Sequence, residues 1–193
     1  MIEAMTQGMT QNTGTIIGSI SVLDGHKKYE NAISKYHQSL SKVYKLSPYD
    51  EIILDDIKLM ATPTKHGDLT GIGCVVTTKH GTIGYTSDTD LLDDFKKCFN
   101  NLTVFIANVI RPKNEIIEGH LCSNKLIDLI NSLENKPKLI IINHMGLRMK
   151  NPEKECDYIT NITGVKTIPA KIGLVIDIYD NEKVSISHLV GHK

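Results

Sequence analysis

Short apolar runs and amphipathic segments alternate in the second half of the chain. The runs 102–110 ("LTVFIANVI") and 137–144 ("PKLIIINH") are apolar enough to predict buried strands. Between them, 123–133 has apolar residues at positions 126, 127, 129, 130 and 133, which predicts an amphipathic helix. A proline opens and a glycine closes 152–164, as is typical of a helix. Three further strands are predicted at 165–171, 173–179 and 184–190.

The first half of the chain contains β-branched and apolar runs separated by turn residues, a pattern that predicts strands. The run 51–66 divides at two consecutive aspartates into two strands, or one strand with a turn. The run 71–89 predicts a hairpin that turns at His80-Gly81. The segment 14–23 is β-rich, and 26–46 combines a short helix with a strand.

One helix is predicted between these halves. Residues 91–99 have helical spacing, with Asp90 as the expected N-cap and Asp93 placed to favour the helix dipole. Strands therefore dominate the first half and alternate with helices in the second, which predicts an α/β protein with mixed sheets. No linker divides the 193 residues, so we expect a single domain over 1–193.

Composition excludes several classes of protein. Lys+Arg and Asp+Glu number 22 each, and zero net charge argues against a mainly electrostatic nucleic-acid binder. No apolar run is long enough to cross a bilayer, and the first residues lack the features of a secretory signal, so a cytoplasmic protein is expected. The four cysteines are far apart, which indicates neither a zinc ribbon nor a disulfide framework.

Four residues that can bind a metal or transfer a proton follow apolar β-runs. They are His66, Asp88, His120 and His144. Functional side chains gather at strand ends in α/β sheets, where loops present them from a rigid frame. Two imidazoles and a carboxylate suit zinc, manganese or iron. Each residue also has an ordinary explanation, as a solvated loop side chain, a helix cap or a hydrogen-bonded strand end.

Two other kinds of function are alternatives to a metal site. The Gly-Ile-Gly at 71–73 lies inside the predicted hairpin and does not open a helix, which argues against a nucleotide-binding loop. A plain β-rich binding module would predict that metal uptake is unchanged when His66, Asp88 or His144 is replaced by alanine.

The segments around the four residues resemble motifs of the metallo-β-lactamase superfamily over roughly residues 1 to 178. "TPTKHGDLTGIGCVV" resembles the motif whose histidine binds the first metal, "GYTSDT" the motif whose aspartate bridges two metals, and "KLIIINH" the last ligand motif. The resemblance implies metal-ligand roles for His66, Asp88 and His144. "EGHLCSNKLIDLI" resembles a segment of ribonuclease Z-like members, which implies a catalytic contact to substrate or leaving group for His120. The wording and spacing of the four motifs are most similar to those of uncharacterised archaeal and bacterial hydrolases of the superfamily.

One motif of the superfamily is absent. The sequence has no His-x-His-x-Asp-His, a motif that in relatives lies just before a segment similar to the "MIEAMTQG" at the start of this sequence. The resemblance therefore implies the C-terminal portion of a metallo-β-lactamase αββα sandwich, a partial fold whose N-terminal strands are missing.

The resemblance implies a metal-dependent hydrolase that acts on an ester or phosphodiester through a metal-activated water, with catalytic roles for Asp88 and His120. One or two ions, zinc or alternatively manganese or iron, are expected to be weakly bound. An uncovered sheet edge favours a homo-oligomer, or a partner chain that covers the missing part. The alternative is a non-catalytic remnant, an interaction or regulatory subunit that needs a partner to complete the site. Lys65, Arg111 and Lys113 either meet an anionic substrate or are solvated loop charges.

Overall fold

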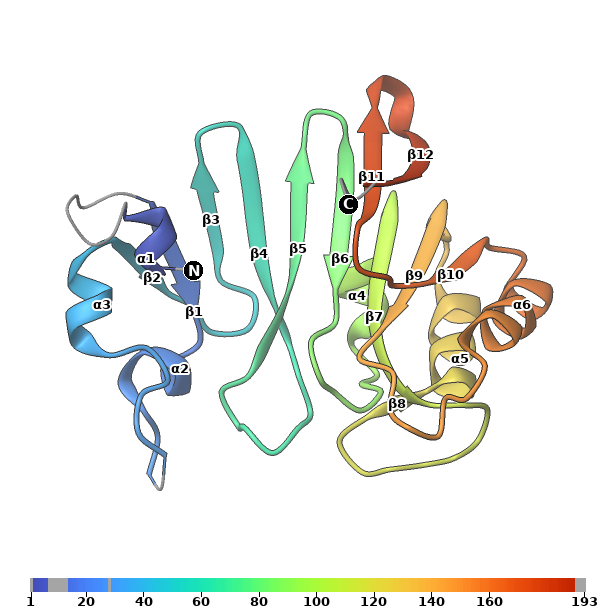
Figure 1. Cartoon of the computed structure of the whole chain (residues 1–193), viewed down its shortest axis with the longest axis horizontal. Helices are drawn as coiled ribbons and strands as arrows, with labels where there is room; N and C mark the ends of the chain where they lie inside the picture. The colour runs from blue at the N-terminus through green and yellow to red at the C-terminus, as the bar shows by residue number, and fades with distance from the viewer. Residues whose placement is uncertain (1, 7–13, 28, 190–193) are drawn as a thin grey trace.

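The computed structural model describes residues 2–6, 14–27 and 29–189. Most of its strands form one mixed sheet in the order β10-β9-β7-β6-β5-β4-β3, with β8 beside β7 (Figure 1). The strands from β3 to β6 are antiparallel neighbours, whereas β6, β7, β9 and β10 run parallel. The strand bounds are β3 (Glu51–Leu54), β4 (Ile57–Pro63), β5 (Ile72–Thr78), β6 (Gly81–Tyr85), β7 (Val104–Arg111), β8 (Leu121–Cys122), β9 (Leu139–Asn143) and β10 (Thr167–Pro169).

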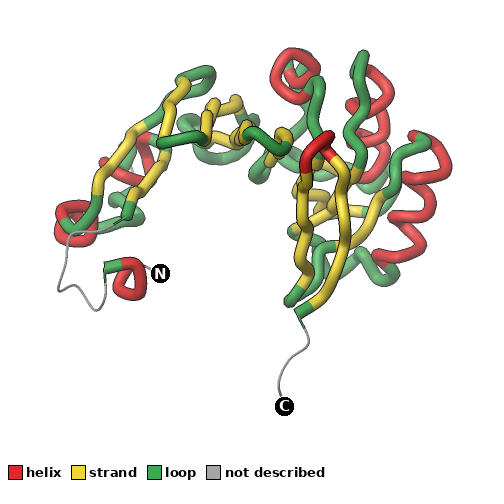
Figure 2. Tube along the Cα trace, turned by 90° about the horizontal axis from the view of Figure 1, so that it is seen from above, coloured by secondary structure: helices red, strands yellow, loops and turns green. Residues whose placement is uncertain are grey.

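Different elements cover the two faces of this sheet (Figure 2). The helices α4 (Phe95–Phe99), α5 (Ser123–Ser132) and α6 (Pro152–Thr163) bury one face in the larger apolar core. The hairpin β11 (Leu174–Tyr179) and β12 (Lys183–His188), joined by the 3-10 turn η1 (Asp180–Glu182), packs on the opposite face. The sheet is therefore apolar on both sides in its parallel half, which explains the continuous apolar runs of β7 and β9.

The N-terminal residues form a smaller unit. Strands β1 (Thr15–Gly18) and β2 (Lys42–Lys45) pair in parallel, with α1 (Ile2–Met5), α2 (Ile20–Asp24) and α3 (Lys35–Ser39) around them. Ser21 ties this unit to the loop after β4: its backbone N–H donates to Thr70 Oγ1 at 3.0 Å, and its hydroxyl donates to Asp68. None of the helices in the described part of the chain has the length and apolar character needed to cross a bilayer.

Most of the predicted elements are confirmed. The apolar positions of 123–133 are all buried, the first four on α5 and Leu133 at its C-cap. Helix α6 begins at Pro152 and ends at Thr163, and its C-cap is Gly164, whose φ is +74°. The run 51–66 contains two strands with a two-residue turn, in which Asp55 has a φ of +53°. Of the final predicted strand, Val190 lies outside the described residues, as do residues 1, 7 and 8 of "MIEAMTQG".

Three predicted details are wrong. The β-rich segment 14–23 is a strand only over β1, because Ser19 takes the N-cap position of helix α2. The β5–β6 hairpin turns at residues 79–80, because Gly81 is already paired with Thr78. Asp90 is not a helix cap: α4 begins at Phe95, and the Asp90 carboxylate is instead bonded to Lys125.

The hairpin that leads to the site depends on Gly73. A Cβ built at this position lies 2.5 Å from the carbonyl oxygen of Tyr85 and 2.7 Å from that of Thr86, and a shift of Tyr85 would disturb its pairing with Cys74 on β5. We expect Gly73→Ala to lower the free energy of unfolding by about 1–3 kcal/mol. Gly67→Ala is the matched control, because a Cβ there meets nothing within 4 Å. Equal denaturant midpoints for the two variants would contradict this prediction.

Candidate metal centre

Four loops at one end of the sheet bring the four predicted residues together. His66 lies after β4, Asp88 after β6, His120 between β7 and β8, and His144 directly after β9. The Nε2 atoms of His66 and His120 are 3.3 Å apart, and His144 Nε2 is 3.4 Å from Asp88 Oδ2. The rings of His120 and His144 are almost parallel, with centroids 6.4 Å apart.

Three of these residues have the geometry of a ligand set. One donor atom from each of His66, Asp88 and His120 lies within 4.8 Å of the other two. Two nitrogens bound to one tetrahedral zinc at about 2.0–2.1 Å lie about 3.3 Å apart, which matches the distance between the two Nε2 atoms. Two histidines and a carboxylate, with a further position open to water, form a typical catalytic zinc site. The residues present therefore fit a divalent ion.

The tautomer of His120 also suits a ligand. Its Nδ1 lies 3.1 Å from the carbonyl oxygen of Glu118, which can only accept a hydrogen bond. The proton is therefore on Nδ1, and a neutral ring then presents the lone pair of Nε2 toward His66. A ligating histidine commonly donates its other N–H to a carbonyl in this way.

A chain of amides orients Asp88. Asn108, which is buried on β7, donates through Nδ2 to Asp88 Oδ1 at 2.7 Å, and the same Nδ2 lies 3.1 Å from the hydroxyl of Tyr85. Asn143, which is paired with Asn108 across β7 and β9, donates to Asn108 Oδ1 at 3.2 Å. With Oδ1 held in this way, the Oδ2 atom of Asp88 faces His144. Such outer hydrogen bonds fix the direction of a ligand.

The backbone at the site is in the left-handed region at three positions. The φ angles are +58° at Ser87, +54° at His144 and +75° at Gly119. A side chain at Gly119 would bring its Cβ to 3.3 Å from the His66 ring, so glycine lets the two loops approach each other. Non-glycine residues are rare in the left-handed region of the backbone, and those that do occur there cluster at functional sites. The positions of Ser87, next to Asp88, and of His144 agree with this tendency.

Two cavities open beside the ligand set. One of about 430 Å³ is lined by His66 and Asp88 together with apolar side chains, among them Ile17, Leu59 and Ile72. A second of about 340 Å³ is lined by Lys65, His66, Gly67, Glu118 and Gly119. Both have room for a small substrate next to the proposed ion, within the 300–1,000 Å³ that ligand sites usually occupy.

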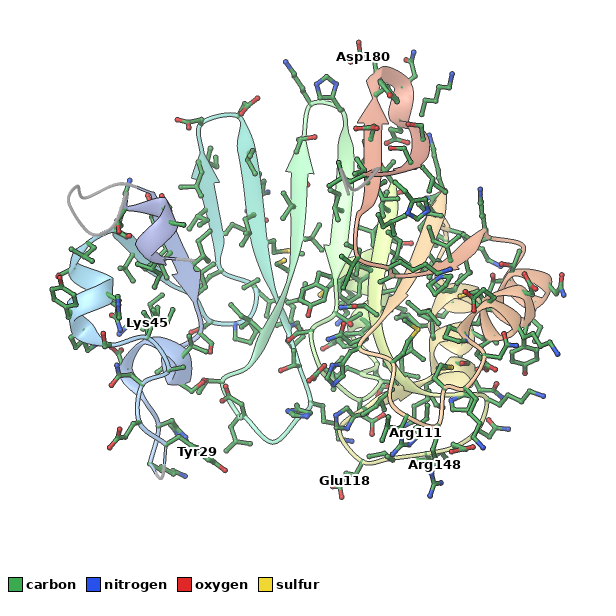
Figure 3. The ribbon with its side chains drawn as sticks, in the orientation of Figure 1. Tyr29, Lys45, Arg111, Glu118, Arg148 and Asp180 are labelled. Carbon is green, nitrogen blue, oxygen red and sulfur yellow. The ribbon has the colours of Figure 1, made fainter. Side chains whose placement is uncertain are left out.

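The charged groups near the site include one ion pair and several basic residues. Burial by itself would raise the pKa of Asp90, but the Lys125 ammonium bonded to it holds that pKa below its ordinary value. Arg111 lies with Arg148 and Glu118 at the site end of the sheet, whereas Asp180 marks the opposite end (Figure 3). Of the basic residues singled out in the sequence, Lys65 lines the second cavity, and Lys113 lies 5.5 Å from the centre of the Tyr158 ring.

The structure thus brings together all four residues predicted from sequence. It also adds Asn108, Asn143 and Lys125, which sequence reasoning missed. The signal for the two asparagines was present: each interrupts or ends an apolar β-run with an amide. A buried amide needs a partner, and the partner of the buried Asn108 is the candidate ligand Asp88. The half-buried Asn143 bonds to Asn108.

Comparisons with known proteins support this description. No protein-family model matches the sequence. The uncharacterized protein MJ1374 of Methanocaldococcus jannaschii is 49% identical over 183 residues, which cover 94% of this chain and 69% of that protein.

Solved structures show the fold. The metallo-β-lactamase fold protein YhfI from Bacillus subtilis superposes with a TM-score of 0.68 at 14% identity, over 90% of this chain and 65% of YhfI. A diphosphatase from the PhnP family has a TM-score of 0.57 at 13% identity, over 81% of this chain and 55% of the diphosphatase chain. Zinc-bound PqqB from Methylobacterium extorquens has a TM-score of 0.61 at 8% identity, over 81% of this chain and 62% of PqqB. The chain therefore spans less than two thirds of each of these solved proteins.

The predicted α/β architecture is confirmed by these superpositions. The ribonuclease Z-like assignment, the missing strands and the ligand roles stay predictions. The mixed sheet, the site at its strand ends and the MJ1374 alignment lead to one conclusion: this chain has the metallo-β-lactamase fold and belongs to the family of MJ1374.

Proposed function

We propose that the chain forms the active site of a metal-dependent hydrolase that cleaves an ester or phosphodiester. The convergence of His66, Asp88 and His120 from three separate loops carries this proposal. The fold supports it, because the proteins that share it include a diphosphatase and a zinc-bound protein. A diiron β-hydroxylase, CmlA from Streptomyces venezuelae, also shares the fold, with a TM-score of 0.59, so iron stays an alternative to zinc or manganese.

Each side chain has a distinct task in this proposal. His66, His120 and Asp88 hold the ion, and Asn108 keeps Asp88 in place. A bound divalent ion supplies a water of lowered pKa and polarises the scissile bond. His144 lies on the other side of Asp88, where its Nε2 would serve as a proton acceptor or as a further metal ligand.

We further propose that another polypeptide segment or a partner chain completes the ligand set when two ions are bound. His66, Asp88 and His120 would hold one ion, whereas a second ion would have only His144 and a share of Asp88. Catalytic zinc usually has three protein ligands. The idea that N-terminal strands complete the sheet belongs to this proposal as well. The ribonuclease Z-like role of His120, a contact to substrate or leaving group, is the alternative to its proposed role as a ligand.

The test is the metal content of the untagged protein after incubation with zinc or manganese and removal of free metal. We expect one ion per chain in the wild type, a loss of that ion in His66→Ala, and weaker binding in His144→Ala. His80→Ala is the control, because His80 is bonded to Asp180 at the far end of the sheet. A wild type that takes up no metal would overturn the proposal and favour the alternative of an interaction or regulatory subunit.

Hydrolysis of p-nitrophenyl acetate and of bis(p-nitrophenyl) phosphate by the metal-loaded protein separates the two substrate classes. Preference for the second, abolished in His66→Ala, would support a phosphodiesterase. Activity that persists in His66→Ala would contradict the proposed site.

A further inference from the structure

One ion pair beside the metal centre differs from the others. Lys125 Nζ is bonded to Asp90 Oδ1, and the two side chains are only 19% and 14% exposed. Every other lysine– or arginine–carboxylate pair among the described residues has both side chains at least 35% exposed. Removing two charges from water is costly, so a buried pair is weak evidence for a stabilising role.

The pair lies where the three ligand loops meet. The backbone N–H of Asp90 donates to the carbonyl of Lys65 at 2.9 Å, next to His66. The N–H of Lys65 in turn donates to Thr89 Oγ1 at 2.8 Å, next to Asp88. Through these two bonds the loop after β4 is attached to the loop after β6.

The third loop is attached by Lys125. Its Nζ lies 3.4 Å from the carbonyl oxygen of His120, in addition to its bond with Asp90. Lys125 belongs to the first turn of α5, whose next residues Leu126 and Ile127 are buried in the core. The ammonium is thus carried by a packed helix, and it connects the loop of His120 to the loop of Asp88.

Neither charged group belongs to the cluster of donor atoms formed by His66, Asp88 and His120. The Oδ1 atom of Asp90 accepts from Lys125 and from the N–H of Leu91 at 2.7 Å, and the Lys125 ammonium has no lone pair while it is charged. The hydrogen bonds of the pair therefore bear on the metal centre through the positions of the loops.

We propose that Asp90 and Lys125 are positioning residues that set the spacing between His66, Asp88 and His120 and so determine the metal affinity of the site. The part of this inference that concerns metal affinity rests on the proposed function, whereas the part that concerns the spacing of the three side chains does not. A hydrogen-bond network that holds three separate loops pre-organises the ligand atoms before the ion arrives. Without the pair, the ion would have to order the loops when it binds. The free energy needed to order them would weaken the binding of the ion.

The test compares Lys125→Met and the double variant Asp90→Asn/Lys125→Met with a matched control, Asp94→Asn/Lys97→Met. The control removes an exposed pair on α4, with side chains 51% and 69% exposed. Metal affinity is measured by competition with a chromophoric chelator. We expect both site variants to bind zinc about 10–100-fold more weakly, as is usual when outer-shell partners are lost, and the control to bind like the wild type. The double variant leaves no buried charge unpaired, so it keeps the test valid if the single variant unfolds.

A second readout needs no metal. The imidazole resonances of His66 and His120 in the metal-free protein report their mutual position, and we expect both to shift in the site variants and not in the control. Lys125→Arg, which keeps the donor, should restore wild-type resonances and most of the affinity. Folded site variants with wild-type imidazole resonances would overturn the proposal. Shifted resonances in a protein whose wild type binds no metal would support the positioning role and count against the proposed function alone.

Discussion

Replacing Asp88 with alanine is expected to remove the bound metal and to lower the hydrolysis rate about a thousandfold or more. A metal that polarises the substrate is worth several kcal/mol in the transition state, and each 1.36 kcal/mol is about tenfold in rate. Asp88 is the residue through which the whole site is connected. One of its oxygens is held by Asn108, the other faces His144 at 3.4 Å, and it lies in the same cluster as His66 and His120.

Two variants make this result specific. Asp93→Ala removes an exposed carboxylate five residues further along the chain and should leave metal content and rate unchanged. Asp88→Asn keeps the shape of the side chain but removes its negative charge, so it should bind metal nearly as poorly as Asp88→Ala. If Asp88→Ala retained its metal and its rate, Asp88 would be neither a ligand nor a bridge.

The second large effect is expected at His120. The resemblance assigns this residue a contact with substrate or leaving group, whereas the structure places its Nε2 3.3 Å from His66 Nε2 and its Nδ1 on a carbonyl. A neutral ring in that arrangement is suited to bind an ion. We therefore expect His120→Ala to lower kcat by about 10²–10⁴-fold and to lose its metal at the same time.

Metal content decides between the two roles of His120. Loss of rate with full metal content would assign His120 to proton donation, and the defect should then be larger for substrates with poor leaving groups. His80→Ala, at the opposite end of the sheet, again serves as the control. An unchanged rate and unchanged metal content in His120→Ala would contradict both roles.

The sequence by itself predicted those strands and helices whose pattern of apolar residues is contained in one segment of the chain. Buried strands β7 and β9 are continuous apolar runs, and α5 and α6 show helical spacing with a clear end at Gly164. The four candidate residues could be identified for the same reason, because each follows an apolar β-run, namely β4, β6, β7 and β9. Where the local signal was weak the prediction was wrong, as in the segment 14–23 and at the cap of α4.

Only the tertiary structure decided which of these residues are neighbours. His66 and His120 are 54 residues apart, and they meet because strands β4 to β7 are adjacent and their loops leave at the same end. The same holds for Asn108 beneath Asp88 and for Lys125 beside Asp90, whose partners lie on other strands or loops. Hydrophobic periodicity describes one element at a time. The order of strands in a sheet depends on which faces pack together, and this order selects the side chains that meet at the candidate metal centre.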